Sequence, residues 1–312
     1  MSAPSRLPAA AVSGPPAGAR TTELVVGVVG AGRVGAALGA ALSRAGHRVV
    51  AASGASAASR HRIAGALPSA RHVSPERVAR LATDLLLLAV PDDALPGVVS
   101  RLARARVVRA GQVVAHTSGA YGRSVLAPLV EQGALPLALH PAMTFTGAPG
   151  DVGLLTGGVP FGVTAPPELR PLVQRLVADL GGTVEWIAEA DRPLYHAALA
   201  HGANHLVTLV NEAMDRLRDA GVVQPERVLA PLLRAALDNT LRLGDAALTG
   251  PVSRGDAGTV DAHLRRLAEV APESVPPYRA LARRTADRAI AAGRLRAVDA
   301  EPLLDVLAGG TS

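Results

Sequence analysis

Two kinds of hydrophobic pattern divide the chain. From Leu24 to about Ile187, short apolar runs alternate with stretches of helical periodicity, and Pro and Gly lie between several of the runs. Runs of this length are typical of buried strands, and their alternation with helices predicts a mostly parallel sheet covered on both faces. The predicted strands span residues 24–29, 48–52, 84–90, 112–116, 135–140, 161–164 and 183–187.

After Asp191 the strand pattern stops and long helical patterns follow. Gly221 can end one helix and Pro225 can begin the next, because the missing N–H of proline costs nothing in a first turn. We predict an α/β fold with a nucleotide-binding domain over residues 22–189, an all-α domain over 190–312, and a disordered tail over 1–21. The predicted helices of the second domain span 192–220, 225–247, 258–270, 277–293 and 297–308.

The composition argues against several kinds of protein. The chain has no cysteine, which excludes disulfides and thiolate metal sites, and we expect no metal. The longest clean apolar run, residues 85–90, is far shorter than the roughly 20 residues that cross a bilayer. The N-terminal segment lacks the continuous apolar core of a signal peptide. We therefore expect a cytoplasmic protein with no membrane partner.

All 32 basic residues are arginine, and the formal net charge is +6. The arginines are scattered and only 2% of residues are aromatic, so we expect no nucleic-acid partner. The absence of lysine also excludes a Schiff-base lysine, a lysine general acid and a P-loop lysine.

A glycine motif follows the first predicted strand. Gly30, Gly32 and Gly35 have the spacing GxGxxG, and an Ala-rich helix follows them through Arg44. In a Rossmann-type domain the first glycine permits a tight turn, the second lets the backbone approach a pyrophosphate, and the third lets the helix pack on the strand. The predicted dinucleotide site therefore contains these glycines together with Arg33 and Val34. Arg33 either contacts the adenosine end of the ligand or is simply exposed.

The end of the second predicted strand favours NADP over NAD. NAD-binding proteins usually carry an acidic residue there, which accepts hydrogen bonds from the ribose hydroxyls. This chain has Ser53 and Ser56 instead, followed by Arg60 and Arg62. Hydroxyl and guanidinium groups suit a 2′-phosphate, so we predict NADP as the cofactor.

Further candidate residues follow the later strands. Val90 and Pro91 end the third long strand, and we expect them beside the nicotinamide ribose. Ser118, in the segment HTSG that begins at His116, and His140 follow two more strands at the same edge. A histidine there can position and protonate a small carbonyl compound. The alternative is that each histidine satisfies local backbone groups.

The helical region carries two further candidate segments. At 100° per residue, His201, Asn204, Thr208 and Asn211 share a helix face, with His196 nearby. That face either lines an interdomain cleft or is an ordinary wet face. In the segment TGPVSRGD, which ends at Asp256, Arg254 is either a clamp on an anionic substrate or part of a helix-capping turn.

These segments carry a resemblance to a family. GVVGAGRVG, HTSGA, YHAALAHGANHLVTL, and TGPVSRGD followed by TVDAHL resemble bacterial Rossmann-like proteins with a C-terminal domain of unknown function 2520. That family is distantly similar to ketopantoate reductase, pyrroline-5-carboxylate reductase and the 6-phosphogluconate dehydrogenase superfamily. The resemblance covers roughly residues 24–290. It implies an NADP-dependent oxidoreductase that forms a homodimer through its helical domain, and it makes 2-dehydropantoate a candidate substrate.

One departure from these relatives bears on the chemistry. Ketopantoate reductase and the β-hydroxyacid dehydrogenases carry a Lys-x-x-x-Asn motif whose lysine protonates the new alkoxide. Asn204 matches the asparagine, but Ala200 occupies the lysine position. The candidates for the proton donor are therefore His196, Tyr195 and His140.

The leading hypothesis is hydride transfer between NADPH and a small carbonyl or imine that bears a carboxylate. Asn204 would orient this anionic substrate, His140 or His196 would protonate it, and Arg254 would pair with its carboxylate. The alternative is a sensor or regulatory protein that binds NADP(H) without catalysis, and a degenerate scaffold is a third reading. The sequence leaves open the substrate, the proton donor, the reaction direction and the oligomeric state.

Overall fold

The computed structural model describes residues 23–309. Contacts between Cα atoms divide the chain after Ala200 into two compact units, which we call the sheet domain (23–200) and the helical domain (201–309). The sequence-predicted division, after residue 189, lies before this point. The predicted disordered tail, residues 1–21, lies outside the described residues.

The sheet domain contains one eight-stranded sheet with the order β3-β2-β1-β4-β5-β6-β7-β8. All neighbouring strands are parallel except β6 and β7, which pair antiparallel. The predicted α/β class and mostly parallel sheet are confirmed. The strands are β1 Val25–Val29, β2 Arg48–Ser53, β3 Arg71–His72, β4 Leu85–Leu88, β5 Val113–His116, β6 Leu135–Pro141, β7 Pro160–Thr164 and β8 Thr183–Trp186.

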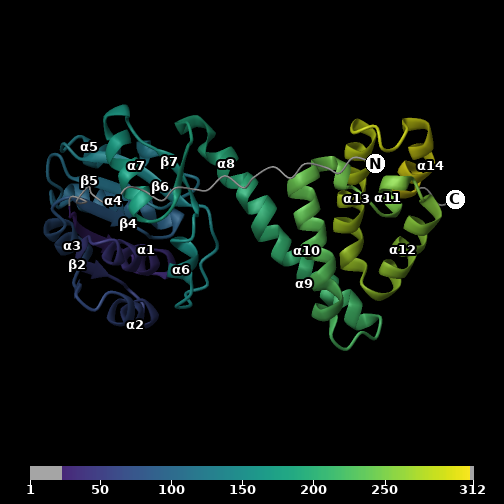
Figure 1. Ribbon diagram of the computed structural model, residues 1–312, viewed down its shortest axis with the longest axis horizontal. Helices are drawn as coiled ribbons and strands as arrows, with labels where there is room; N and C mark the ends of the chain where they lie inside the picture. The colour runs from purple at the N-terminus through teal and green to yellow at the C-terminus, as the bar shows by residue number, and fades with distance from the viewer. Residues whose placement is uncertain (1–22, 310–312) are drawn as a thin grey trace, which may run out of the picture. The chain divides into compact units, whose positions relative to one another are not determined.

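Helices cover both faces of this sheet (Figure 1). One face packs against α1, α2, α6 and α7, and the other packs against α3, α4 and α5. The bounds are α1 Arg33–Arg44, α2 Ala57–Ala66, α3 Pro75–Leu81, α4 Leu95–Arg104, α5 Ala127–Val130, α6 Asp151–Leu155 and α7 Arg170–Asp179. Short 3₁₀ turns span Asp92–Ala94, Arg123–Leu126, Pro167–Leu169 and Glu189–Asp191.

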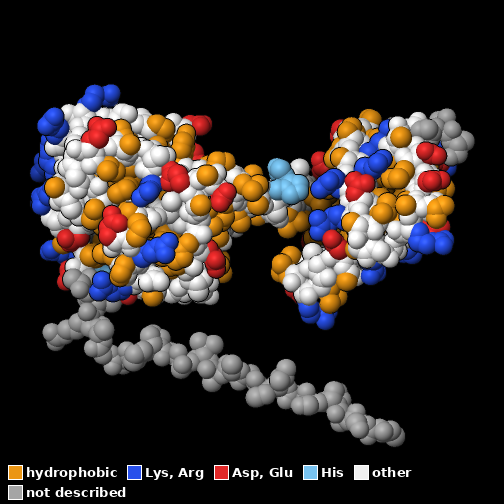
Figure 2. All heavy atoms as spheres, turned by 90° about the horizontal axis from the view of Figure 1, so that it is seen from above, with side chains coloured by type: hydrophobic (Ala, Val, Ile, Leu, Met, Phe, Trp, Pro, Cys, Tyr) orange, Lys and Arg blue, Asp and Glu red, His pale blue; other side chains and the backbone are white. Residues whose placement is uncertain are grey.

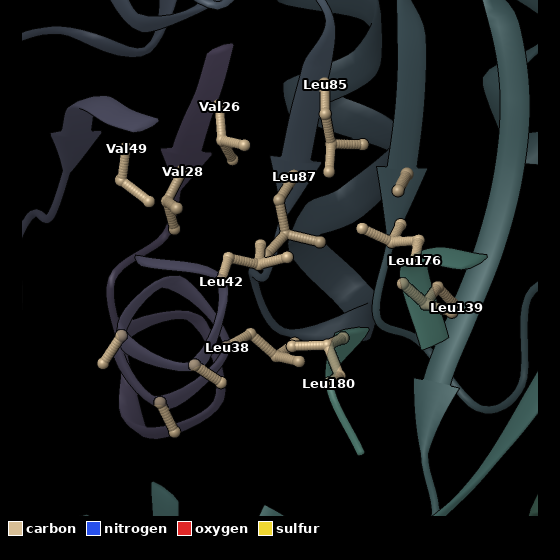
Figure 3. Close-up of a cluster of buried hydrophobic side chains, with 14 of the residues drawn as sticks. Val26, Val28, Leu38, Leu42, Val49, Leu85, Leu87, Leu139, Leu176 and Leu180 are labelled. Atoms are coloured by element: carbon tan, nitrogen blue, oxygen red, sulfur yellow. The ribbon is translucent and has the colours of Figure 1, made fainter. Parts of the chain in front are cut away.

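Strand β4 shows why this layered arrangement needs apolar runs. Leu85 and Leu87 point to the face covered by α1 and α7, whereas Leu86 and Leu88 point to the face covered by α3 and α4. Figure 3 shows the first of these layers, with Leu38 and Leu42 of α1 packed against the strand side chains. Each fully buried leucine contributes roughly 1.5–3 kcal/mol to stability. A central strand buried on both sides therefore has no polar position.

The long helix predicted for residues 192–220 is three elements. Helix α8 (Arg192–Leu199) is followed by a π-helical turn over Ala200–Asn204 and then by α9 (His205–Asp219). A π turn places more residues per turn than an α-helix does. The 100° spacing that related His201 to Thr208 therefore does not hold across it. Of the predicted polar face, only Thr208 and Asn211 lie together in the regular helix α9.

The core of the helical domain lies among its last four helices. Apolar residues of α11 (Pro251–Arg254), α12 (Ala257–Val270), α13 (Val275–Ala291) and α14 (Ala297–Ala308) form its buried clusters. The remaining pair, α9 and α10 (Pro225–Leu243), lie side by side. Helix α9 buries none of its residues and α10 buries only Pro225. Hydrophobic side chains are visible on the surface of this domain (Figure 2).

Candidate functional site

The glycine motif forms a tight turn between β1 and α1. Gly30 has a φ of +88°, and a Cβ atom on it would lie 2.6 Å from the carbonyl oxygen of Ala89. The backbone N–H groups of Gly30 and Ala31 both donate to the carbonyl of Ser53, at 3.1 and 2.8 Å. Only glycine tolerates this conformation and this close approach. The turn is therefore fixed to the end of β2.

The other two glycines of the motif differ in their surroundings. Gly32 is the N-cap of α1 with no side-chain hydrogen bond, and a Cβ there would meet nothing nearer than 4.0 Å. Gly35 is buried, and a Cβ on it would collide with the Gly30 carbonyl. The first turn of α1 thus presents free N–H groups on an open side, which suits a phosphate. Arg33 and Val34 continue this turn, the first exposed and the second half-buried.

Ser53, Ser56 and Arg60, which were predicted to bind the 2′-phosphate, lie at the end of β2 and the start of α2. Ser53 is buried, and the exposed Ser56 caps α2 by accepting from the Ser59 N–H at 3.0 Å. Arg60 donates from Nη1 to the Ala55 carbonyl at 2.8 Å. The side chains of Ser56 and Arg60 are therefore engaged in holding the start of α2.

Arg33 and Arg62 meet on the loop that follows β6. A Cβ on Gly147 would lie 3.2 Å from Arg33 Cγ and 3.6 Å from Arg62 Nε. Within residues 23–309, neither guanidinium has a carboxylate within salt-bridge distance. Asp151 shapes this loop, because its carboxylate accepts from Thr146 Oγ1 at 3.0 Å and from the Gly147 N–H at 2.7 Å. Two arginines without a carboxylate partner among the described residues thus approach the same point of this loop.

The carboxyl ends of the central strands lie at one edge of the sheet. Val29 of β1 is level with Leu88 of β4, Leu88 with His116 of β5, and His116 with Ala138 of β6. Val90, half-buried, follows β4 at this edge, and its Cγ1 would lie 2.7 Å from a Cβ on Gly30. The exposed Pro91 then begins the 3₁₀ turn before α4.

His140 lies at the same edge, bonded to a tyrosine from α8. Its Nδ1 is 2.9 Å from the Tyr195 hydroxyl, and its ring is 6.0 Å from that of His196, centroid to centroid. A Cβ on Gly119 would lie 3.1 Å from His140 Nε2 and 2.7 Å from His196 Cδ2. The glycine after Ser118 thus leaves room for two imidazoles. The structure brings His140, Tyr195 and His196 together.

Burial keeps His140 and Tyr195 uncharged. Burial lowers the pKa of His140 to about 4, and the charges of His196, Arg192 and His116 act in the same direction. Burial also raises the pKa of Tyr195, so its hydroxyl keeps its proton and can donate to His140 Nδ1. Where the hydroxyl donates, the proton of the neutral imidazole is on Nε2.

His116 and Ser118 hold the loop after β5. His116 is fully buried, its Nε2 lies 2.8 Å from the Gly122 carbonyl, and burial lowers its pKa to about 4. The Ser118 hydroxyl accepts from the N–H groups of Ala120 and Tyr121 at 3.2 and 3.1 Å. His116 therefore fits the alternative interpretation, in which the histidine satisfies a local backbone group.

The comparisons with known proteins agree with this architecture. Residues 11–141 match the Rossmann-like domain family, and residues 159–285 match the domain of unknown function DUF2520. The chain is a Rossmann-like DUF2520 protein. No curated protein matches the chain significantly.

Three solved structures illustrate the likeness of this DUF2520 protein to known folds. A Bacteroides fragilis protein, provisionally named an NADP oxidoreductase, is 21% identical with a TM-score of 0.69, covering 85% of this chain and 98% of that one. A reductive aminase from Aspergillus terreus, in complex with NADPH and ethyl levulinate, is 18% identical with a TM-score of 0.61, covering 88% and 95%. A 1-pyrroline-5-carboxylate reductase from Streptococcus pyogenes is 17% identical with a TM-score of 0.58, covering 86% and 99%. At these identities the likeness establishes the fold.

Two predicted site residues of the DUF2520 protein lie in its helical domain. Asn204 is exposed in the π turn, where the neighbouring His201 and His205 approach each other with their Nδ1 atoms 3.2 Å apart. Arg254, in α11, donates from Nε and Nη2 to Asp256 Oδ2 at 3.0 and 2.8 Å. The side chain of Arg254 is therefore paired within its own turn.

Two negative findings concern residues 23–309 only. No group of three or more His, Asp and Glu side chains there is arranged to hold a metal ion. Over the same residues, no helix combines the length and the hydrophobicity that a membrane span requires.

Sequence reasoning missed two residues of this site. Glu189 accepts from the Arg123 and Ser124 N–H groups at 2.9 and 3.0 Å, and so holds the loop after β5 against the start of α8. Arg192 is fully buried beneath His140 and bonds to three segments. A charged residue beside Pro193 at a helix start looks like an ordinary exposed first turn, so the sequence carries no signal of its burial.

Proposed function

We propose that this protein is an NADP-dependent oxidoreductase that reduces a small imine or carbonyl compound. The observation that carries the proposal is the position of two groups at one edge of one sheet. The glycine turn at the end of β1 suits a dinucleotide, and the His140–Tyr195–His196 cluster lies at the carboxyl end of β6 on that edge. Ligands of open α/β sheets bind at the carboxyl ends of the strands, where the strand order reverses, and here that point lies between β1 and β4.

The cofactor proposed for the site is NADP. Its pyrophosphate would meet the open N–H groups of α1 beside Gly32. Its 2′-phosphate would meet Arg33 and Arg62, whose guanidinium groups are unpaired within the described residues and suit a phosphate. Solved structures of similar fold contain NADP or NADPH, which supports the choice. Ser56 and Arg60 would act indirectly, by fixing α2.

The substrate would lie against His140 Nε2. When bound, NADPH supplies a hydride, and the substrate must also gain a proton on its nitrogen or oxygen. An imine nitrogen or the carbonyl oxygen of a 2-oxo acid such as 2-dehydropantoate would accept a hydrogen bond from Nε2–H. On reduction that atom would take the Nε2 proton, while Tyr195 passes its own proton to Nδ1 and is left as tyrosinate.

Calorimetry with NADPH and NADH tests the cofactor assignment. We expect NADPH to bind more tightly, and Arg33→Ala and Arg62→Ala each to weaken NADPH binding at least tenfold while leaving NADH binding nearly unchanged. Arg60→Ala is the matched control, since its guanidinium already bonds to Ala55. Failure to bind either nucleotide would overturn the proposed function.

A second pair of variants tests the glycine turn. Gly30 and Gly46 both have positive φ, +88° and +95°, but a Cβ on Gly46 would meet nothing within 4 Å. Gly30→Ala and Gly46→Ala therefore share backbone strain, and only the first blocks the turn. We expect Gly30→Ala to lose NADPH binding and Gly46→Ala to keep it.

A substrate panel then separates enzyme from sensor. The panel contains cyclic imines, oxo acids including 2-dehydropantoate, and oxo acids mixed with amines, with NADPH oxidation as the readout. Turnover that falls at least 100-fold in His140→Ala supports the proposal. Tight NADPH binding without turnover across the panel, and an unchanged conformational response in His140→Ala and His196→Ala, would favour an NADP(H) sensor.

We also propose that a second copy of the chain covers the α9–α10 pair. Isolated helices are marginal in water unless an apolar face is buried, yet these two helices expose many large hydrophobic residues. Large exposed apolar surfaces are typical of interaction sites. The exposed residues are Leu206, Val207, Leu209, Val228, Leu232, Leu237, Leu241 and Leu243.

Sedimentation velocity tests this homodimer. Leu232→Asp, on α10, should convert dimer to monomer, whereas Leu154→Asp, on α6, should not, although the two leucines are similarly exposed at 63% and 65%. A wild-type protein that stays monomeric at every concentration would contradict the proposal.

A further inference from the structure

Arg192 is a buried cation with an unusual set of partners. Its exposed fraction is 0%, and all three guanidinium nitrogens donate hydrogen bonds. Nε donates to Thr164 Oγ1 at 2.8 Å, and Nη1 donates to the Ser118 carbonyl at 3.3 Å. Nη2 donates to the carbonyls of Ala138 and Gly162 at 3.1 and 3.0 Å. One side chain from α8 therefore joins β6, β7 and the loop after β5.

The charge of Arg192 is solvated by dipoles rather than by a carboxylate. Within the part of the chain that the structure describes, no Asp or Glu lies within salt-bridge distance of it. Glu189, whose carboxylate is engaged with the Arg123 and Ser124 N–H groups, acts on it only at longer range. Burying a charge without a counter-ion is costly. Arginine stays protonated there because its pKa is so high.

This positive charge lies next to the groups of the candidate site. Its guanidinium carbon is 5.9 Å from the centroid of the Tyr195 ring, and its charge acts on both His116 and His140. The other titratable groups that act on His140 are His196 from α8 and His116 from β5. No carboxylate is among them, so every neighbouring charge opposes a second proton on the imidazole.

Arg192 also fixes where His140 can meet a ligand. The Ser118 carbonyl that it holds precedes Gly119, and a Cβ on Gly119 would lie 3.1 Å from His140 Nε2. The Ala138 carbonyl that it holds lies two residues before His140 on β6, and Gly162 is the strand partner of His140. The same guanidinium thus holds the backbone on two sides of His140, in the loop after β5 and in the partner strand β7.

We propose that Arg192 is a positioning residue that adds to the effect of burial in keeping His140 neutral and aims its Nε2–H at the substrate, by holding a permanent positive charge beside Tyr195 and by fixing the backbone on two sides of His140. The role toward the substrate rests on the proposed function. The role toward His140 does not, because the imidazole can be titrated without any ligand.

The first experiment titrates His140 by NMR in the full chain. Arg192→Met removes the charge and keeps much of the side-chain volume, and we expect the pKa of His140 to rise by about 1. Arg192→Lys keeps a cation, and we expect a smaller rise. Arg170→Met is the matched control, since Arg170 lies over the Trp186 ring, 4.8 Å from its centroid, and has no such bonds. An unchanged His140 titration in Arg192→Met, or equal rises in Met and Lys, would overturn the proposal.

The second experiment measures turnover against pH with a substrate found in the panel. Arg192→Met should lower kcat at least tenfold with the KM for NADPH nearly unchanged, and should move the acidic limb of the profile upward. Arg192→Lys should restore the acidic limb but not kcat, because an ammonium cannot make the forked set of bonds. If Arg192→Met does not fold, Arg192→Lys still decides, since an unchanged kcat there would overturn the positioning role. If the wild-type chain shows no turnover, the proposed function is wrong, and the NMR titration of His140 alone tests the role of Arg192.

Discussion

The sheet domain and the α9–α10 pair of the helical domain use hydrophobic residues in opposite ways. In β4 every residue is buried, two on each face of the sheet. In α9 no residue is buried, and both α9 and α10 expose several leucines. Apolar residues therefore form a completed core in one region and an uncovered surface in the other. Local periodicity predicts that a face is apolar, and the rest of the assembly decides what covers it.

The largest expected effect comes from the core of the sheet. Leu86→Ala should lower the free energy of unfolding by about 3–5 kcal/mol, because it removes a fully buried side chain and leaves a cavity. Leu241→Ala on α10, where the leucine is 79% exposed, should change it by less than about 0.5 kcal/mol in the monomer. Urea unfolding measures both, and equal losses would contradict the contrast between the regions.

Acid should affect the sheet domain through its two buried histidines. His116 and His140 have pKa values lowered to about 4 from 6.5, so the unfolded chain binds more protons between these limits. Stability is therefore full above pH 6.5 and falls as the pH drops toward 4, by about 2–3 kcal/mol for each histidine at most. His140→Asn should remove about half of this loss of stability between pH 6.5 and pH 4. If the loss is unchanged in this variant, His140 is not the group that titrates.

The loop that carries Gly147 offers a smaller effect in the same domain. Asp151→Asn replaces a buried carboxylate that accepts two hydrogen bonds, and we expect a loss of about 1–2 kcal/mol in stability. Because this loop contacts Arg33 and Arg62, NADPH affinity should fall as well, which calorimetry measures. If Asp151→Asn is destabilised but binds NADPH with normal affinity, the loop does not contribute to the phosphate site.

The smallest effect is expected among the surface ion pairs of the helical domain. Arg266 and Glu269 lie 2.8 Å apart on α12, with side chains 73% and 65% exposed. Such pairs contribute at most about 0.5 kcal/mol. Arg266→Ala should be neutral within that range by thermal unfolding, and a larger loss would mean that this surface is covered in the assembled protein.

Most of the sheet could be predicted from the sequence, because each buried strand needs an apolar run and each run here is bounded by Pro or Gly. Strand β3, only Arg71 and His72, could not, since two exposed residues carry no pattern. The π turn was missed for a related reason: one extra residue in a turn changes the geometry without changing the composition.

The residues of the candidate site also divide into those with a local signal in the sequence and those without one. Gly30, Gly32 and Gly35 could be located because their motif is local, and His140 because it follows a strand. Arg192 could not, because its partners are backbone carbonyls on strands more than twenty residues away, which no spacing in the sequence encodes. The hydroxyl of Ser118, predicted near the cofactor, accepts two hydrogen bonds within its own turn.

The single tryptophan of the chain, Trp186, lies on β8 with the guanidinium of Arg170 over its ring. Intrinsic fluorescence excited at the red edge of the absorption band therefore observes only the sheet domain. Circular dichroism in the far ultraviolet observes the helices of both domains. Recording the two signals along one denaturation would show, without any label, whether the two domains melt together or one after the other.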